Sequence, residues 1–428
     1  MNLNIASNQL CAMILISKEQ LTAPRSAVQG DFMIKKLLAS AAAVGFALTA
    51  TTALAADAVK IGVITTLTTP AAVLGNEQMN GFNLAMKHLG GKAGGLDIEL
   101  IAEDDGFKPD IGKQKAEKLV KQDDVDIVTG LIWSHVMLAS TPTILKAGKF
   151  AISANAGHSK LAGKNCHENF FNASWQNDTV PMALGHVLNS EGMNSVYIMA
   201  PNYAAGKDMA NGVAATFKGE IKGKDLTKWG KDAQLDFSAE LAKAKASGAD
   251  ALFVFYPGKA GGAFMKQFGQ AGLGDSMKLF TVFTVDGISL PKFQAAGMNS
   301  VLGSVDTMHW NVDFDNEQNK RFVADFRAEH GRYPSFYAAQ AYDTMFMIDA
   351  AVAAVGGDLS NKDGMREAMM KADYASVRGD FSYGHNHFPV QSFYLREVVE
   401  GEDGAWVHKT KKVVLEDFVD PHAADCSM

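Results

Sequence analysis

The chain has 428 residues, of which 47% are hydrophobic and 20% are charged. Its 40 lysines and arginines are outnumbered by 47 aspartates and glutamates, which gives a formal net charge of −7 at pH 7. This acidic balance argues against nucleic acid or an anionic membrane surface as a partner, because both repel a negatively charged protein. The length is too great for one compact core and suits two lobes.

Residues 33–56 have the three parts of a secretory signal peptide. Lys35 and Lys36 form the positive start, residues 37–48 form the apolar segment, and Ala53-Leu-Ala55 fits the small-residue cleavage pattern. The apolar segment is shorter than the about 20 residues that a membrane span needs. No cysteine that could carry a lipid anchor follows the cleavage point. We therefore expect residues 1–32 to be a non-native upstream extension, and the mature protein to be soluble in the periplasm.

From Val59 onward, apolar runs of strand length alternate with segments of helical period. The second segment, for example, places Phe82, Ala85, Met86 and Leu89 on one helix face. The strands predicted for the first half are 59–64, 96–102, 125–129 and 150–153, with helices around 82–89, 111–120 and 137–147 between them. Strands and helices that alternate at this spacing predict βαβ units and a parallel sheet.

A second series of the same kind follows Trp175. Its predicted strands are 195–199, 249–256, 278–283 and 301–307, and its helices are about 178–191, 205–218, 238–247 and 259–271. Two helices in a row are then predicted at 317–329 and 335–355, and the tail reads as short antiparallel strands. The fold class that follows is α/β, with two similar doubly wound parallel-sheet lobes.

The sequence has three cysteines, and Cys11 lies upstream of the predicted cleavage point. Cys166 and Cys426 remain as an even pair in an oxidising compartment, so a disulfide is the simplest interpretation. Closing so long a loop contributes at most roughly 5 kcal/mol on the chain-entropy model. Neither residue has a CxxC neighbour or a Cys/His cluster, which argues against a metal or catalytic role.

Signatures of nucleotide-binding proteins and of common hydrolases are missing. The chain contains no GxxxxGK[ST], GxGxxG, GxSxG or HExxH motif. His385-Asn-His387 lies in a Gly/Asn/Pro segment without a carboxylate cluster, which is typical of a turn rather than of a metal site. We expect a protein that is not an enzyme and that has no cofactor or metal.

In open parallel sheets a ligand lies beyond the carboxyl ends of the strands, where helix N-termini favour a carboxylate. This rule selects the loops 130–135, 153–157, 201–206, 256–258 and 285–287. Each candidate residue also has a structural interpretation that stays open here. Ser134 is either an N-cap or a ligand contact, and Trp133 belongs either to the core or to the cleft. Tyr203 and Tyr256 can be strand-end packing residues, and Asp286 before a glycine can be a turn residue.

The chain from Val59 to Met428 resembles the substrate-binding proteins of ABC importers of the branched-chain amino acid (Leu/Ile/Val) type, which are type I periplasmic binding proteins. The resemblance rests on the order and spacing of several short segments: Val59-Lys-Ile-Gly-Val, Gly81-Phe-Asn-Leu-Ala, Ile127-Val-Thr-Gly130, Asn202-Tyr-Ala-Ala-Gly206 and Pro334-Ser-Phe-Tyr-Ala-Ala-Gln-Ala-Tyr-Asp343. It implies two lobes that are joined by three crossovers and close on a ligand. The implied lobes are 57–175 with about 311–375, and about 176–310 with about 376–428. The implied partner is a permease in the inner membrane, and the implied state is a monomer.

The resemblance also assigns site residues by position. Ser134 and the backbone around Ala154 and Asn155 match carboxylate-binding loops of the first lobe, with Trp133 and His135 beside them. Tyr203 and Tyr256 match aromatic residues of the second lobe. Asp286 matches the acidic residue that pairs with a substrate ammonium.

The sequence departs from the amino-acid pattern in its bulkier first loop, in the Asn155 amide and in the shorter acid at Asp286. The 174–178 stretch and the cysteine pairing resemble a branch associated with aromatic carboxylates. The expected ligand is therefore an amino acid of the branched-chain type or a related small carboxylate, and an aromatic carboxylate is the alternative. A ligand-sensing partner of a membrane receptor fits the same features, whereas no nucleophile–base arrangement supports a secreted hydrolase.

Overall fold

The structure is a computed structural model, and it describes residues 58–428; the side chain of residue 231 is not described. The predicted signal peptide at 33–56, the predicted upstream extension and Cys11 all lie outside the described residues.

The first sheet has six strands in the order β2-β3-β1-β4-β5-β6. Its strands are β1 (Ala58–Thr65), β2 (Lys92–Ala93), β3 (Leu96–Asp104), β4 (Ile127–Gly130), β5 (Phe150–Ser153) and β6 (Phe170–Asn172). All neighbours pair in parallel except the short hairpin of β2 and β3. The centre of β1 and all of β4 and β5 are buried, because helices cover both faces of a parallel sheet. The predicted parallel sheet is confirmed.

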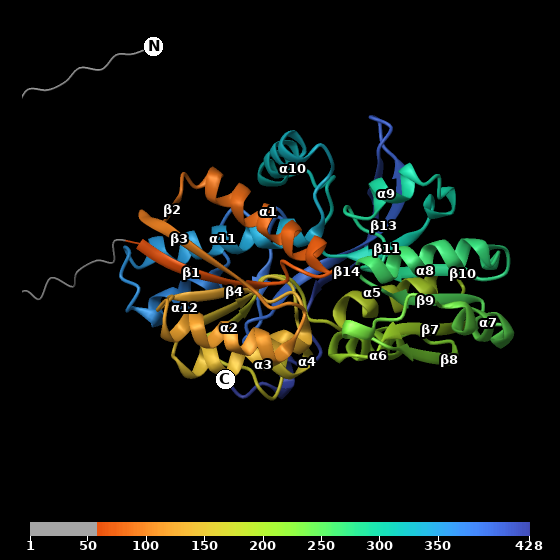
Figure 1. Cartoon of the computed structure of the whole chain (residues 1–428), viewed down its shortest axis with the longest axis horizontal. Coiled ribbons are helices and arrows are strands. Elements are labelled where there is room, and N and C mark those ends of the chain that lie inside the picture. Colours follow the sequence, from red (N-terminus) through yellow and green to blue (C-terminus); the bar gives the residue numbers. More distant parts are fainter. Residues whose placement is uncertain (1–57) are drawn as a thin grey trace, which may run out of the picture. The chain divides into compact units, whose positions relative to one another are not determined.

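Seven helices accompany this sheet among the described residues: α1 (Ala72–His88), α2 (Pro109–Lys121), α3 (Ser134–Lys146), α4 (Ser159–Ala162), α10 (Glu317–His330), α11 (Phe336–Ala354) and α12 (Lys362–Lys371). Figure 1 shows α1 and α11 on one side of the first sheet and α2 and α3 on the other. Gly81 allows α1 and α11 to approach closely, since a Cβ atom there would clash with the carbonyl of Ala338. The later helices thus return to the first sheet.

The second sheet has eight strands in the order β12-β13-β11-β10-β9-β7-β8, and β14 pairs with β13. The strands are β7 (Ser195–Pro201), β8 (Glu220–Thr227), β9 (Ala251–Phe255), β10 (Lys278–Val282), β11 (Val305–Met308), β12 (Ser382–Tyr383), β13 (Pro389–Glu400) and β14 (Trp406–Phe418). The first five of these are parallel to one another, and the last three are antiparallel. The tail is therefore antiparallel as predicted, but β13 and β14 have 12 and 13 residues and are not short.

The helices of the second lobe are α5 (Thr179–Ser190), α6 (Ala204–Thr216), α7 (Ser238–Ser247), α8 (Lys259–Gln270) and α9 (Leu290–Ala295). The strand β8 was not predicted, because most of its residues are exposed or half-buried and the segment lacks an apolar run. The short strand β6, three residues long, was also missed. Burial imposes the weakest pattern on an edge strand such as β8, whereas β6 is fully buried but is too short for a period to show in the sequence.

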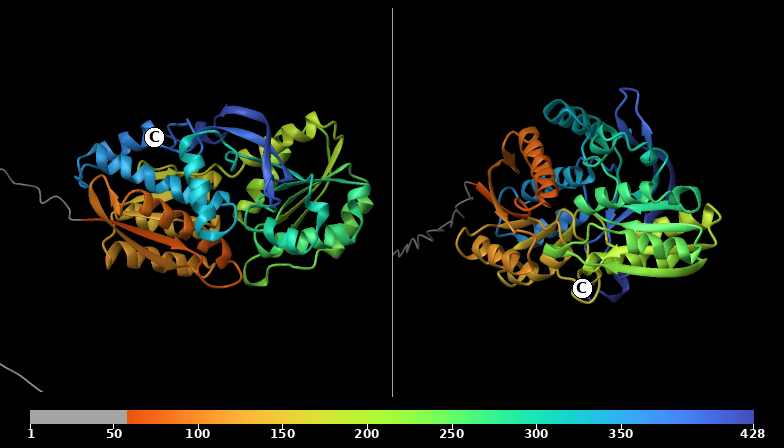
Figure 2. Two further views of the ribbon diagram at one scale, coloured as in Figure 1. Left: turned by 90° about the horizontal axis from the view of Figure 1, so that it is seen from above. Right: turned by 45° about the vertical axis from the view of Figure 1, so that its right-hand side comes forward.

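The chain crosses between the two sheets three times. It leaves the first sheet after β6, returns after β11 to form α10, α11 and α12, and crosses again before β12. Figure 2 shows the orange strands of the first sheet and the green strands of the second in separate lobes. The predicted two-lobed α/β fold is confirmed, while the exact domain boundaries stay a prediction.

The predicted disulfide is present in the structure. Cys166 and Cys426 are bonded, with 5.7 Å between their Cα atoms and a sequence separation of 260. Cys426 follows the last strand of the second sheet, whereas Cys166 lies between β5 and β6 of the first. The bond therefore ties the C-terminal segment to the first lobe.

Removal of this disulfide by the double substitution Cys166→Ser/Cys426→Ser is expected to lower the free energy of unfolding by about 2–4 kcal/mol, because the unfolded chain gains loop entropy. Urea unfolding under oxidising conditions measures the change. The serine variant and the reduced native protein should behave alike, and a double variant as stable as the oxidised native protein would contradict the expectation.

Within residues 58–428, no helix is both long enough and apolar enough to cross a membrane.

Candidate functional site

The carboxyl ends of strands from both sheets meet around one small cavity. It has a volume of about 20 Å³ and is lined by Ile132, Trp133, Ser134, Asn155, Ala156, Trp175, Asn177, Tyr203, Ala205, Met209, Phe255, Pro257, Phe283 and Tyr337. Most of these residues directly follow β4, β5, β6, β7, β9 or β10, which is where open α/β sheets bind ligands. The volume holds about one water molecule, so the lobes must separate for a larger ligand to enter.

The first-lobe wall is formed by the turn from β4 into α3. Gly130 has φ +93°, and a Cβ atom there would clash with the carbonyl oxygen of Ile64, so the turn requires glycine. The turn leaves Trp133 extended as the N-cap of α3, and no side chain caps the helix. Of the two interpretations of Ser134, the N-cap is therefore wrong: Ser134 is already the first helical residue, and its Oγ accepts a hydrogen bond from Asn177 Nδ2 at 3.1 Å.

The second-lobe wall is formed by the turn from β7 into α6. Tyr203 is the N-cap of α6, again without a side-chain hydrogen bond. Gly206 lets the first turn of the helix lie against the end of the strand, because a Cβ atom there would clash with the carbonyl of Pro201. The two walls therefore present the open N-termini of two helices of 13 residues each, and each carries roughly half a positive charge.

Aromatic rings supply most of the remaining surface. The rings of Trp175 and Phe283, from different lobes, are stacked with centroids 4.6 Å apart and an interplanar angle of 25°. Tyr203 and Phe255 are nearly parallel at 6.3 Å. Trp133 is anchored by a hydrogen bond of 2.8 Å from its Nε1 to Thr66 Oγ1. Walls of this kind favour a flat, apolar ligand body.

The cavity wall carries no formal charge. Among the fourteen lining residues, all of which the structure describes, none is Asp, Glu, Lys, Arg or His. The side chains with polar atoms are Ser134, Asn155, Asn177, two tryptophans and two tyrosines. The positive ends of α3 and α6 are therefore the main electrostatic feature, and they favour a small anion.

A buried carboxylate links the walls of the cavity to each other. Asp208 of α6 accepts hydrogen bonds from Asn177 Nδ2 at 3.0 Å and from the backbone nitrogen and hydroxyl of Ser159, both at 3.2 Å. Burial and the nearby Asp178 carboxylate raise the pKa of Asp208 to about 6. Asn177 also holds Ser134, so this network couples α6 of the second lobe to α3 and α4 of the first.

A wider apolar cavity of about 360 Å³ lies outside the inner one. Trp133 lines both cavities, and Phe107, Trp229 and Leu74 are among the residues of the outer one. The Trp229 ring stacks on Tyr203 with centroids 5.4 Å apart. The outer cavity therefore forms an apolar approach to the site between the lobes.

The structure brings four of the predicted site residues together on the inner cavity, namely Trp133, Ser134, Asn155 and Tyr203. His135 lies beside them, with its ring 5.5 Å from Tyr203, and burial lowers its pKa to about 4, so the imidazole is neutral at pH 7. Ala154 is fully buried, and its N–H donates to the carbonyl of Gly130. Trp133 belongs both to the core and to the cleft, because it is 3% exposed and also lines the cavity.

Tyr256 does not line the cavity. Its ring packs between Phe237 and Phe264, and its hydroxyl lies 3.1 Å from Thr227 Oγ1. Its neighbour Phe255 lines the cavity instead. Successive side chains of a strand point to opposite faces, and the sequence pattern at the end of β9 does not show which of the two aromatic residues faces the ligand.

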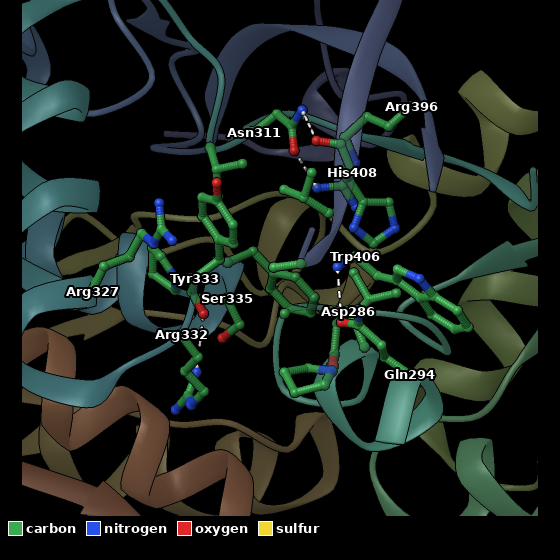
Figure 3. A pocket seen from close by; sticks show the side chains of 18 of the residues that line it. Asp286, Gln294, Asn311, Arg327, Arg332, Tyr333, Ser335, Arg396, Trp406 and His408 are labelled. Atoms are coloured by element: carbon green, nitrogen blue, oxygen red, sulfur yellow. Dashed lines mark hydrogen bonds between the residues drawn. The ribbon is translucent and has the colours of Figure 1, made fainter. Parts of the chain in front are cut away.

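Asp286 lies on a different cavity, of about 220 Å³, which Figure 3 shows. Its Oδ1 accepts hydrogen bonds from the backbone nitrogens of Ile288 and Ser289 at 3.0 and 2.8 Å, as in a turn. Burial and the nearby Glu77 carboxylate raise the pKa of Asp286 to about 6. The three arginines on this wall are paired with carboxylates: Arg327 with Asp403, Arg332 with Glu77 and Arg396 with Asp306.

Sequence reasoning missed Trp175, Asn177, Phe283 and Tyr337 as lining residues. Trp175 and Asn177 follow β6, and the strand-end rule selects them only once that three-residue strand is known. Phe283 directly follows β10, so the same rule applied one residue beyond Val282 finds it. Tyr337 lies in the first turn of α11, and this helix follows another helix instead of a strand. The strand-end rule therefore cannot select it.

Comparisons with known proteins place the chain in a family. The profile of a family described as "Periplasmic binding protein" matches residues 58–405. The chain is 31% identical over 390 residues to the Leu/Ile/Val-binding protein homolog 6 of Brucella abortus (strain 2308), which covers 88% of this chain and 96% of that protein.

Two solved structures extend the comparison. A solute-binding protein of an ABC transporter from R. palustris, in complex with benzoate, matches with a TM-score of 0.79 and 28% identity over 87% of this chain and all of that one. A second, from Rhodopseudomonas palustris BisB5 in complex with 3,4-dihydroxybenzoic acid, matches with a TM-score of 0.78 and 27% identity over 86% of this chain and 99% of that one. Fold, ligand-cleft geometry and sequence agree: the chain belongs to the periplasmic binding protein family.

Proposed function

We propose that this protein is the solute-binding receptor of an ABC importer, which binds a small aromatic carboxylate between its lobes and delivers it to a permease in the inner membrane. It acts in the periplasm as a monomer, after removal of the signal peptide, and neither catalysis nor a cofactor is part of the proposal. The family and the signal-peptide pattern at 33–56 support the transport role and the location.

One observation carries the choice of ligand: two uncapped helix N-termini, from different lobes, meet at an aromatic cavity without a charged side chain. The N–H groups of the first turns of α3 and α6 provide donors for a carboxylate, and Ser134 and Tyr203 stand at these two helix ends and line the cavity. The stacked pair Trp175 and Phe283 and the near-parallel pair Tyr203 and Phe255 suit a planar ring. The benzoate and 3,4-dihydroxybenzoic acid found in the two R. palustris proteins have this chemistry.

A branched-chain amino acid is the second candidate, because curated relatives carry the name Leu/Ile/Val-binding protein homolog. Such a ligand brings an ammonium group that needs a negative partner when it is buried. The carboxylate predicted for that role, Asp286, lies on the other cavity, and the inner cavity contains no acidic residue among the described residues that line it. The aromatic acid therefore fits the charge of the site better.

The test is a ligand panel on the purified protein, unfolded and refolded to remove any ligand that it carries. Calorimetry is run with benzoate, hydroxybenzoates and cinnamate, and with Leu, Ile, Val and Phe. We expect binding of at least one aromatic acid and no measurable binding of the aliphatic amino acids. Binding of Leu, Ile or Val without any aromatic acid would overturn the proposal in favour of the second candidate.

The substitution Asp286→Asn separates the two ligand classes. We expect the affinity for the aromatic acid to stay within threefold of the native value, because no ammonium needs the carboxylate. An amino acid held by Asp286 would instead bind more than tenfold more weakly, a loss above about 1.4 kcal/mol. Asp236→Asn is the matched control, because exposed Asp236 makes a comparable turn with Ser238 outside the cleft.

A further inference from the structure

Two buried polar atoms on the wall of the inner cavity have no hydrogen-bond partner: Asn155 Oδ1 and Trp175 Nε1. The two residues are 8% and 3% exposed. Asn155 Nδ2 donates to the carbonyl of Ile132 at 2.7 Å, which identifies the remaining amide atom as the acceptor. Buried polar groups are nearly always satisfied, so a ligand that enters this cavity is the natural partner of both atoms.

The two loops that carry these atoms are bound tightly to each other. Ser174 Oγ donates to the carbonyl of Asn155 at 2.7 Å, and the backbone nitrogen of Asn177 donates to the carbonyl of Gly157, also at 2.7 Å. Gly157 lies directly against the backbone of Trp175, where a Cβ atom would clash with its carbonyl oxygen. The acceptor and the donor therefore belong to one rigid part of the first-lobe wall.

The Trp175 ring is also held in place by its neighbours. It stacks on Phe283 and meets Phe336 edge-on, with centroids 5.6 Å apart and an interplanar angle of 72°. His309, whose ring centroid is 5.3 Å away, makes no hydrogen bond to it, and neither imidazole nitrogen has a partner among the described residues. Phe336 belongs to α11, which packs on the first lobe like Trp175 itself, so this edge-on contact holds the ring when the lobes separate, and the stack on Phe283 forms again when they close.

One buried acceptor and one buried donor together define the chemistry of the missing group. A carboxylate could accept from the indole N–H but would repel the amide oxygen, and an ammonium could donate to the amide but would leave the indole unsatisfied. A hydroxyl group donates one hydrogen bond and accepts another, so it satisfies both atoms without bringing a charge into the site.

Resting on the proposed function, we infer that the site selects hydroxylated aromatic acids over unsubstituted ones. A ring hydroxyl of the ligand donates to Asn155 Oδ1 and accepts from Trp175 Nε1. The carboxylate of the same ligand binds at the open N-termini of α3 and α6. A ligand that lacks the hydroxyl leaves two buried polar atoms unpaired, which is the physical basis of the selection.

The test compares dissociation constants for benzoate and for 2-, 3- and 4-hydroxybenzoate by calorimetry on the native protein. We expect at least one hydroxybenzoate to bind tenfold or more tightly than benzoate. Trp175→Phe keeps a flat ring against Phe283 and removes the N–H. It should lower that ratio to threefold or less, whatever it does to the affinities for benzoate and hydroxybenzoate together.

Trp229→Phe is the matched control. Trp229 also carries a buried Nε1 without a partner, but it lines the outer cavity and not the inner one. This variant should leave the hydroxybenzoate-to-benzoate ratio unchanged, whatever it does to both affinities together.

The remaining outcomes separate this inference from the proposed function. If benzoate binds as tightly as every hydroxybenzoate to the native protein, a bound water satisfies the two atoms, and the inference is wrong while the proposed function stands. If the preference exists but survives Trp175→Phe, the assignment to Trp175 is wrong. If no aromatic acid binds at all, the proposed function fails and this inference fails with it.

Discussion

Replacing Ser134 by aspartate is expected to weaken binding of an aromatic acid at least 100-fold. Ser134 is the first residue of α3, is 2% exposed and lines the inner cavity. A carboxylate at this position repels the ligand carboxylate and competes with it for the free N–H groups of the first turn. Two like charges about 4 Å apart repel by roughly 4 kcal/mol at an effective dielectric constant near 20, which exceeds the roughly 2.7 kcal/mol of a 100-fold loss. Calorimetry with the best aromatic ligand measures the effect.

The control for this substitution is Ser238→Asp. Ser238 is likewise the first residue of a helix without a side-chain cap, α7, but it is exposed and outside the cleft. The control should bind the ligand as tightly as the native protein does. Thermal unfolding without ligand should show both variants folded, since an acidic residue in the first turn favours a helix. A Ser134→Asp protein that binds within threefold of the native affinity would exclude the N-terminus of α3 from the anion site.

Replacing Arg396 by methionine is expected to lower the free energy of unfolding by about 3–5 kcal/mol. Arg396 of β13 and Asp306 of β11 face each other across the antiparallel pair, with Nη2–Oδ2 and Nε–Oδ1 distances of 2.6 and 2.9 Å. Both side chains are almost fully buried, at 4% and 2% exposure. Without the arginine, Asp306 becomes an unpaired charge in a low-dielectric interior. Urea unfolding followed by circular dichroism and by fluorescence measures the loss, and coincident curves justify a two-state fit.

The loss of unfolding free energy in Arg396→Met should depend on pH because of His408. Its Nε2 lies 3.5 Å from Asp306, and burial together with the Arg396 charge lowers its pKa to about 4. Loss of the arginine charge raises this pKa in the folded state. A raised pKa of His408 stabilises the folded variant at low pH, and this contribution is lost as the pH rises. The variant should therefore lose more unfolding free energy, relative to the native protein, at pH 8 than at pH 5.

Two further variants serve as controls for the buried pair. Lys411 and Glu397 form an exposed ion pair on the neighbouring strands, at 2.8 Å and with 49% and 30% exposure, so Lys411→Met should cost less than about 1 kcal/mol. The double variant Asp306→Leu/Arg396→Met should recover much of the loss, because it leaves no buried charge. If Arg396→Met costs no more than Lys411→Met, the interpretation of the buried pair is wrong.

The repeating pattern of the chain made its local elements predictable. The apolar run at 59–64 became β1, and the face formed by Phe82, Ala85 and Met86 became part of α1. Both could be predicted because a fully buried parallel strand appears as a continuous apolar run, and a helix that covers it repeats its apolar residues with the helical period. The edge strand β8 imposes little burial, and for that reason the same pattern did not show it.

The candidate site was partly predictable for a similar reason. Trp133, Ser134 and Tyr203 stand directly after strands β4 and β7, and parallel strands deliver their carboxyl ends to one edge of the sheet. The rule locates a loop but not the direction of a side chain. It could not show that Phe255 rather than Tyr256 lines the cavity, or that Asp286 lies on the cavity shown in Figure 3.

The sequence by itself determined the alternating α/β elements, the two-lobed fold, the family and the pairing of Cys166 with Cys426, because each depends on a residue pattern along the chain. Only the tertiary structure decided which residues meet. Asn177 joins Ser134 to Asp208, Trp175 stacks on Phe283 across the lobes, and Asn155 and Trp175 share one rigid wall. These contacts join residues that are distant in sequence, and their geometry depends on how two sheets and three crossovers pack together, which local periodicity does not encode.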